Sequence, residues 1–195
     1  MKKLTILCDL DGIVADLLGE WIRRANELHG TDIKLEQVDR WDIHECVPMG
    51  HAIYKLLTPG LFAAIKPVPG AVEALKSFHD AGHDVTIVTA SASDPGTAAA
   101  KIAWVREYLP WMDRKDVFIG HKKHLIRGDV LIDDSPENIL AYRKAWPDAQ
   151  IVTIAYPYNA EVRFVTNFRA HSHHYFASAW SSIRSYVDAL AWEQL

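Results

Sequence analysis

The sequence predicts an α/β fold in which a parallel β-sheet is covered by helices on both faces. Short apolar runs alternate along the chain with longer segments whose apolar residues recur every three or four positions. The short runs are continuously apolar instead of alternating between apolar and polar residues. Unbroken apolar strands are typical of parallel sheets, because both faces of such strands are buried.

The first part of the chain holds one expected strand and one clear helix. The strand is the run 4–8, which ends at Asp9. The helix is expected over 14–28, where apolar residues recur at helical spacing. Residues 31–66 are less regular and contain several Pro and Gly breaks. We therefore expect an insert of short helices, and we assign it to residues 13–68.

The rest of the chain continues the alternation of strands and helices. The further expected strands are 84–89, 116–120, 129–134 and 150–156. The further expected helices are 71–81, 97–109, one that begins at Ser135-Pro136, and 176–192. Ser favours the N-cap of a helix and Pro its first position. Residues 1–12 and 69–195 are thus expected to form one α/β core domain.

Composition and charge limit the classes of function. The chain has 195 residues, 49% of them hydrophobic, which is enough for one buried core with an insert. Its net charge of -4 argues against binding of nucleic acid polymers or anionic membranes. Two cysteines give no disulfide framework, and no apolar run approaches the ~20 residues of a membrane span. We expect a soluble, cytoplasmic monomer or homodimer.

Four carboxylates stand at the ends of two expected strands. Asp9 and Asp11 follow the first strand, and Asp133 and Asp134 end the strand at 129–134. Ligands of open α/β sheets bind at the carboxyl ends of the strands, so these side chains are expected to meet. Clustered carboxylates repel one another, and a divalent cation removes that repulsion. Oxygen ligands completed by water and phosphate suit Mg²⁺, which is the cofactor we expect.

A carboxylate in such a site can do covalent chemistry on a phosphate ester. It can attack phosphorus to form an aspartyl-phosphate, while a neighbouring carboxylate handles the proton of the leaving group. A cationic side chain must then hold the phosphoryl oxygens. The segment 121–129 offers Lys122, Lys123 and Arg127 for this purpose.

These residues resemble, in order and placement, the four motifs of the haloacid dehalogenase-type (HAD-like) phosphatase superfamily. The matching positions are Asp9-Leu10-Asp11-Gly12, Thr89, a Lys before the fourth strand, and Asp133-Asp134. The resemblance implies a Rossmann-like core. It also implies that Asp9 is the nucleophile and that Asp11 is the general acid and then the general base.

The same resemblance implies roles for the remaining motif residues. Thr89 would hydrogen-bond the phosphoryl group, and Lys123 would steady Asp9 and the phosphate. Lys123 is preferred to Lys122 because the superfamily's Lys stands six residues before the Asp that opens the fourth strand, here Asp129. Mg²⁺ would be bound by Asp9, the backbone carbonyl of Asp11, and Asp133, with Asp134 acting partly through water.

Four segments resemble a narrower family, the 5'(3')-deoxyribonucleotidases, which remove phosphate from deoxynucleoside monophosphates. The segments are DLDGIVAD (9–16), KPVPGAVEALKSF (66–78), AWVREYL (103–109) and GDVLIDDSPEN (128–138). This resemblance implies that residues 13–68 form a small helical cap whose Trp41 and Tyr54 stack on the base. Thr89 and Ala90 stand where the family has a substrate-binding Thr-Ser pair, and Leu17 stands where it often has an aromatic residue.

Other interpretations remain open. The substrate could be another small phosphate ester, such as a sugar phosphate or a nucleic-acid 3'-phosphate, or the chain could be a non-catalytic binding module with this fold. Trp41 and Tyr54 could be packing residues between insert and core. His171, His173 and His174 are expected to lie in a solvated loop, because no Cys or acidic partner stands near them to complete a metal site.

Overall fold

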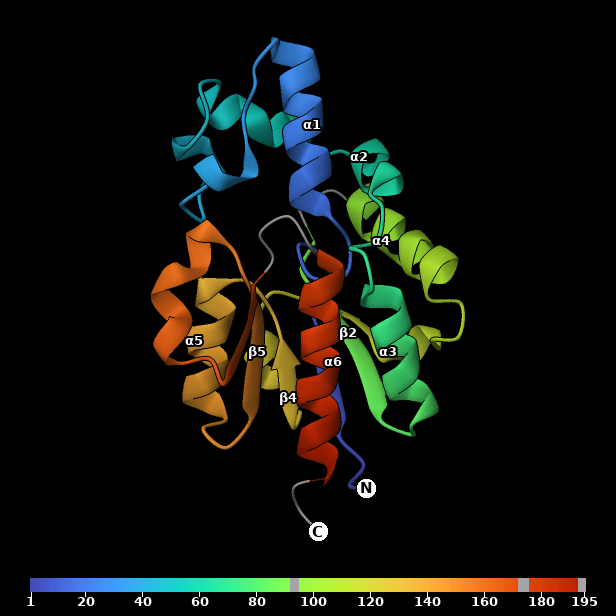
Figure 1. The fold of residues 1–195 in the computed structure, drawn as a ribbon. Coiled ribbons are helices and arrows are strands. Elements are labelled where there is room, and N and C mark those ends of the chain that lie inside the picture. Colours follow the sequence, from blue (N-terminus) through green and yellow to red (C-terminus); the bar gives the residue numbers. More distant parts are fainter. Residues whose placement is uncertain (92–94, 172–175, 193–195) are drawn as a thin grey trace.

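The computed structural model describes residues 1–91, 95–171 and 176–192, and Figure 1 shows their arrangement. Within these residues six parallel strands form one sheet in the order β3-β2-β1-β4-β5-β6. The strands are β1 (Thr5–Cys8), β2 (Asp84–Thr89), β3 (Val117–Ile119), β4 (Val130–Ile132), β5 (Gln150–Ala155) and β6 (Phe168–His171). The predicted parallel α/β fold is confirmed.

Strand β6 is the one strand of the sheet that the sequence analysis missed. It pairs with β5 from Val152–Phe168 to Ala155–His171 and forms an edge of the sheet. Its sequence, Phe-Arg-Ala-His, is not an apolar run, because only Ala170 in it is fully buried. The expected solvated loop at His171 is thus replaced by an exposed strand end, while His173 and His174 lie outside the described residues.

Helices pack on both faces of the sheet, and β1 shows how. Ile6 belongs to one apolar cluster with Phe78 and Trp180. The next residue, Leu7, belongs to a second cluster with Tyr142. Because successive side chains of a strand point to opposite faces, each face of the sheet has its own core.

The helices that supply these cores begin and end close to the predicted positions. Their bounds are α1 (Leu17–His29), α2 (Pro59–Ala64), α3 (Ala71–Asp80), α4 (Pro95–Tyr108), α5 (Pro136–Ala145) and α6 (Phe176–Trp192). Helix α1 begins three residues later than predicted, because the Asp16 side chain accepts a hydrogen bond from the Gly19 amide and serves as its N-cap. Among the described residues, no helix has the length and apolar character that crossing a membrane requires.

The segment between β1 and α3 lies beyond the carboxyl ends of the strands, at the top of Figure 1. It contains α1, α2 and the 3₁₀ helices η1 (Leu35–Gln37), η2 (Ile43–Glu45) and η3 (Gly50–Leu56). Trp21 of α1 is buried and donates its indole N–H to the Ile53 carbonyl at 2.9 Å. This bond fixes α1 against η3, so the segment has an internal structure of its own.

Candidate active site

The candidate site lies at the carboxyl end of β1. The chain runs from β1 to β2 and β3 on one side and then returns to β4 on the other side of β1. Open α/β sheets bind ligands at such a switch point. Asp9 follows β1 and Asp133 follows β4, and these two strands are directly paired. The prediction that the first and fourth strands lie side by side is confirmed.

Three of the four predicted carboxylates form a tight buried cluster. Asp9, Asp133 and Asp134 each present one oxygen, and these oxygens all lie within 4.8 Å of one another. Burial raises the pKa of Asp9 from 3.8 to about 7, with the nearby Asp133 and Asp11 adding to the rise and Lys123 opposing it. Burial also raises the pKa of Asp134 well above its usual range. A cation bound here would offset the cost of burying these negative charges.

Lys123 supplies one positive charge to this cluster. It begins η5 (Lys123–Leu125) and its side chain is only 3% exposed. Its ammonium lies 2.7 Å from Asp9 Oδ1 and 2.8 Å from Asp133 Oδ2. Lys122, the other candidate at this position, is exposed. The geometry therefore supports the choice of Lys123 over Lys122.

Asp133 and Asp134 differ in how their oxygens are occupied. Asp133 Oδ1 accepts the Ser135 amide at 2.9 Å, Oδ2 accepts from Lys123, and the Asn138 amide lies 3.3 Å from both oxygens. Asp134 Oδ2 accepts the Tyr158 hydroxyl, whereas its Oδ1 is buried with no hydrogen-bond partner among the described residues. Both oxygens of Asp133 are therefore occupied by protein donors, whereas Asp134 keeps one oxygen free to bind a cation.

Asp11 stands apart from the three clustered carboxylates. Its Oδ2 forms an ion pair with Lys101, and its Oδ1 is buried without a hydrogen-bond partner in the described part of the chain. The loop that carries it turns at Gly12, whose φ of +74° suits glycine. A Cβ on Gly12 would lie 2.3 Å from Asp134 Oδ2, so glycine also lets the two aspartate loops approach.

Lys101 of α4 is a second buried cation that the sequence analysis missed. Its side chain is 4% exposed, and its ammonium contacts Asp11, the Ala90 carbonyl and, at 3.2 Å, Thr89 Oγ1. It also lies 5.0 Å from the centre of the Phe62 ring, in cation–π range. A signal was available, because Lys101 falls at the helical spacing of the buried face of α4, between Thr97 and Trp104.

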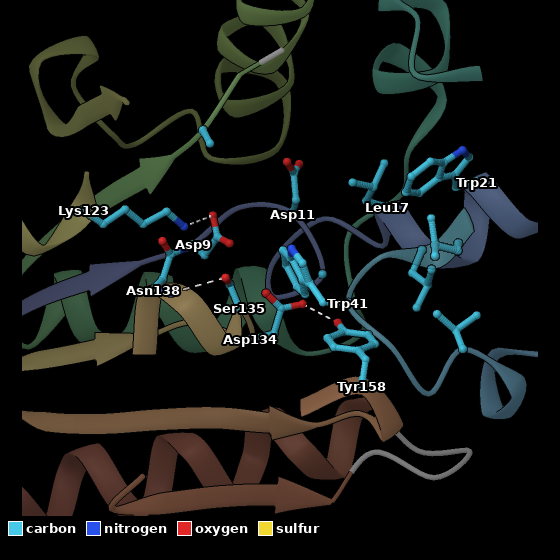
Figure 2. A pocket seen from close by; sticks show the side chains of 15 residues that line it. Asp9, Asp11, Leu17, Trp21, Trp41, Lys123, Asp134, Ser135, Asn138 and Tyr158 are labelled. Atoms are coloured by element: carbon cyan, nitrogen blue, oxygen red, sulfur yellow. Dashed lines mark hydrogen bonds and ion pairs between the residues drawn. The ribbon is translucent and has the colours of Figure 1, made fainter. Parts of the chain in front are cut away.

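The cluster opens into a pocket beneath the segment 13–68, drawn in Figure 2. Its polar side includes Asp9, Asp11, Lys123 and Asp134. Its apolar side is built by the segment 13–68, through Leu17, Leu18, Trp21, Val38, Trp41 and Ile43. Ser135, Asn138 and Tyr158 complete the wall beside Asp134. A charged floor below an apolar wall suits a small molecule with an anionic group and a flat apolar part.

The predicted substrate-binding residues divide between the pocket and its surroundings. Trp41 lines the pocket, is 50% exposed, and meets the Tyr158 ring edge-on. Ala90 also lines it, whereas Thr89 is fully buried and accepts from Lys101. Tyr54 is not among the lining residues. Tyr54 packs on Trp21, with 5.6 Å between the ring centres, and so it lies behind the residues that line the pocket.

Comparison with known proteins agrees with this architecture. A sequence profile of the family described as "5' nucleotidase, deoxy (Pyrimidine), cytosolic type C protein" matches residues 2–180. A 5'(3')-deoxyribonucleotidase of Bacillus subtilis (strain 168) is 28% identical over 142 residues, which make up 73% of this chain and 81% of the relative.

Solved structures show the same fold at lower identity. A HAD family hydrolase of Deinococcus radiodurans R1, with bound phosphate and sodium, superposes with a TM-score of 0.60 at 16% identity over 95% of each chain. A conserved haloacid dehalogenase-like protein of Agrobacterium tumefaciens gives a TM-score of 0.64 at 16% identity, over 97% of this chain and all of that one. The expected HAD-type core is therefore confirmed.

Proposed function

The chain belongs to the family of cytosolic-type 5' deoxynucleotidases, and from this membership we propose that it is a Mg²⁺-dependent phosphatase that hydrolyses deoxyribonucleoside monophosphates. One observation carries the proposal. A buried group of three carboxylates and Lys123 opens into a pocket whose opposite wall is apolar and aromatic. The first part suits a phosphoryl group with a cation, and the second suits a base and a deoxyribose.

The donor set fits a hard divalent cation. Asp9 and Asp134 would bind it through carboxylate oxygens and Asp11 through its backbone carbonyl, with Asp133 held behind them by Lys123. The unpartnered buried Asp134 Oδ1 is the atom that most needs such a partner. When bound, Mg²⁺ supplies positive charge that offsets the carboxylates and the phosphoryl oxygens.

The chain's own residues would carry the reaction in two steps. In the first, Asp9 attacks phosphorus, the bond from phosphorus to the ester oxygen breaks, and Asp11 gives its proton to that oxygen. In the second, Asp11 takes a proton from water, the water oxygen attacks phosphorus, and the bond to Asp9 breaks to release inorganic phosphate. Lys123 holds Asp9 in place for the attack and balances charge on the phosphoryl oxygens.

Residues 13–68 would act as a cap over a core of residues 1–12 and 69–195. The apolar wall comes from this segment, so it supplies the surface that would recognise the nucleoside. Trp41 is the flat side chain best placed to stack on a base, being half exposed within the pocket wall. The family description contains the word "cytosolic", and a cytoplasmic location would place the enzyme with its substrates.

A kinetic screen tests the proposed function. The purified protein is assayed with Mg²⁺ against all deoxy- and ribonucleoside monophosphates, sugar phosphates, glycolate phosphate and a 3'-phosphorylated oligonucleotide. We expect the highest kcat/KM with deoxynucleoside monophosphates and loss of turnover after chelation. Faster turnover of a sugar phosphate or of the oligonucleotide would reject the substrate assignment. Absence of Mg²⁺-dependent activity with every ester would instead indicate a binding module.

Replacement of Trp41 by Ala tests the aromatic wall. Stacking of a base on an aromatic side chain is worth about 1–3 kcal/mol, so KM for a deoxynucleotide should rise roughly 5- to 150-fold. KM for p-nitrophenyl phosphate, which has no base, should change far less. Tyr54→Ala is the comparison variant, because Tyr54 lies behind the wall. Equal effects of Trp41→Ala on both substrates would show that Trp41 only packs.

A further inference from the structure

We propose that Tyr158 is a positioning residue that joins the cation-binding side of the pocket to its aromatic wall. The proposal rests on the proposed function for the identity of these two sides. Tyr158 lies in η6 (Pro157–Phe164), and its side chain is 8% exposed. Its two ends face different parts of the site, as Figure 2 shows for its neighbours Asp134 and Trp41.

The hydroxyl end of Tyr158 fixes one aspartate. It donates to Asp134 Oδ2 at 2.5 Å, and the other oxygen of that carboxylate, Oδ1, is buried without a partner among the described residues. A carboxylate anchored at one oxygen cannot rotate freely, so the direction of its second oxygen is set. Hydrogen bonds of this kind orient the ligands of a metal and raise its affinity.

The ring end of Tyr158 supports the aromatic wall. Its ring meets Trp41 edge-on, with 5.5 Å between ring centres and 69° between planes. This is the arrangement that the charge distribution of aromatic rings favours. Trp41 comes from the segment 13–68 and is half exposed, so the Tyr158 ring is a fixed surface of the core on which it rests.

Neighbouring contacts hold Tyr158 itself in place. Its ring stacks on Tyr156, with 5.0 Å between centres and 9° between planes, and the Tyr156 hydroxyl donates to the Gly12 carbonyl at 2.7 Å. Asn159 donates to the Asp134 carbonyl at 3.1 Å. These two bonds tie η6 and its N-cap residue Tyr156 to the loops that carry the candidate catalytic residues. Movement of Tyr158 would therefore disturb Asp134 and Trp41 together.

Tyr158→Phe tests the hydroxyl end. The chelator-treated protein is titrated with Mn²⁺, and free Mn²⁺ is measured by electron paramagnetic resonance. We expect the Kd for Mn²⁺ to rise about 10- to 100-fold, as is typical when a residue that orients a metal ligand is lost. At saturating metal, KM for a deoxynucleotide should change far less than the Kd for Mn²⁺, because the ring remains. Unchanged Mn²⁺ affinity would overturn this part of the proposal.

Tyr142→Phe is the matched control for this titration. Tyr142 is also a buried tyrosine, but its hydroxyl bonds to the backbone of Gly128 just before β4, at the amino end of that strand. It should bind Mn²⁺ as the wild type does. An equal loss of affinity in both variants would show a general effect of removing a buried hydroxyl and would overturn the assignment to Tyr158.

Tyr158→Leu tests the ring end in combination with Trp41→Ala. Alone, Tyr158→Leu should raise KM for the deoxynucleotide more than KM for p-nitrophenyl phosphate. In the Trp41→Ala background, Tyr158→Leu should not raise KM for the deoxynucleotide any further relative to KM for p-nitrophenyl phosphate, because the Trp41 ring that Tyr158 supports is already absent. An equal selective effect in both backgrounds would overturn the ring's role. The Mn²⁺ titration needs no substrate. If the protein had no nucleotidase activity, the proposed function would be wrong, but the titration would still show whether the Tyr158 hydroxyl orients Asp134.

Discussion

Replacement of Asp9 by Asn should reduce turnover of every phosphate ester by ~10⁴-fold or more while leaving the protein folded. A carboxamide cannot serve as the nucleophile in this reaction, so the covalent step is lost. Measurement of kcat with a deoxynucleotide and with p-nitrophenyl phosphate checks both substrate classes. Activity near that of the wild type would exclude Asp9 as the attacking group and with it the two-step mechanism.

The fold should tolerate Asp9→Asn because the amide keeps the shape and one acceptor oxygen of the carboxylate. Asp9 Oδ1 accepts the Leu10 amide at 2.7 Å, a bond that an amide oxygen can retain. The substitution also removes one negative charge from a buried, mutually repelling group. Asp129→Asn is the matched control, because Asp129 pairs with Lys2 at the amino end of β4 and should keep activity.

The same variant should alter the pH dependence of stability of the metal-free protein. The pKa of Asp9 is raised by burial from 3.8 to about 7, so the folded state holds this proton more tightly than the unfolded state does. The resulting stabilisation is complete below about pH 4 and is lost as the pH rises to about 7. In thermal melts with chelator, wild type should lose stability over this range relative to Asp9→Asn. Parallel curves would show that Asp9 is not the group that titrates.

The sequence predicted the structure best in the central strands, where burial on both faces restricts which residues can stand there. Central strands such as β1 and β4 are buried on both faces, so their apolar runs and terminal carboxylates stand out. The adjacency of Asp9 and Asp133 then follows from the order of parallel strands. Strand β6 lacked such a run, because Ala170 is the one buried residue of its four.

Local pattern can place a residue on a buried face, as it does for Lys101, but it does not show which distant residue that side chain contacts. Lys101 reaches Asp11 across 90 positions of the chain, and Tyr158 meets Trp41 only after the insert has folded over the core. Trp21 and Tyr54 show that local pattern also does not predict which aromatic residues line the pocket. Both are aromatic residues of the insert, yet Trp21 lines the pocket while Tyr54 packs behind it. Helical or loop position alone does not decide which aromatic side chain faces the ligand.

Replacement of Lys101 by Met should lower kcat/KM by about 10²- to 10³-fold, the typical cost of losing one preorganised charge from an active site. Lys101 and Lys123 are the two buried ammonium groups that face the four aspartates among the described residues. Met fills a similar volume without charge. Asp11 would then lose its ion pair, and the site would meet a phosphate dianion with one positive charge fewer.

Two comparisons separate this role from a structural one. Lys122→Met removes an exposed ammonium one residue from Lys123 and should leave kcat/KM unchanged. Lys101→Arg retains the charge and should recover part of the activity that Lys101→Met loses. Circular dichroism and thermal melts establish that each variant is folded. Because the Lys101 ammonium pairs with Asp11, whose proposed proton transfer is common to all phosphate esters, the loss should affect p-nitrophenyl phosphate and deoxynucleotides alike. An effect confined to nucleotides would place Lys101 in base recognition and contradict its assignment to Asp11.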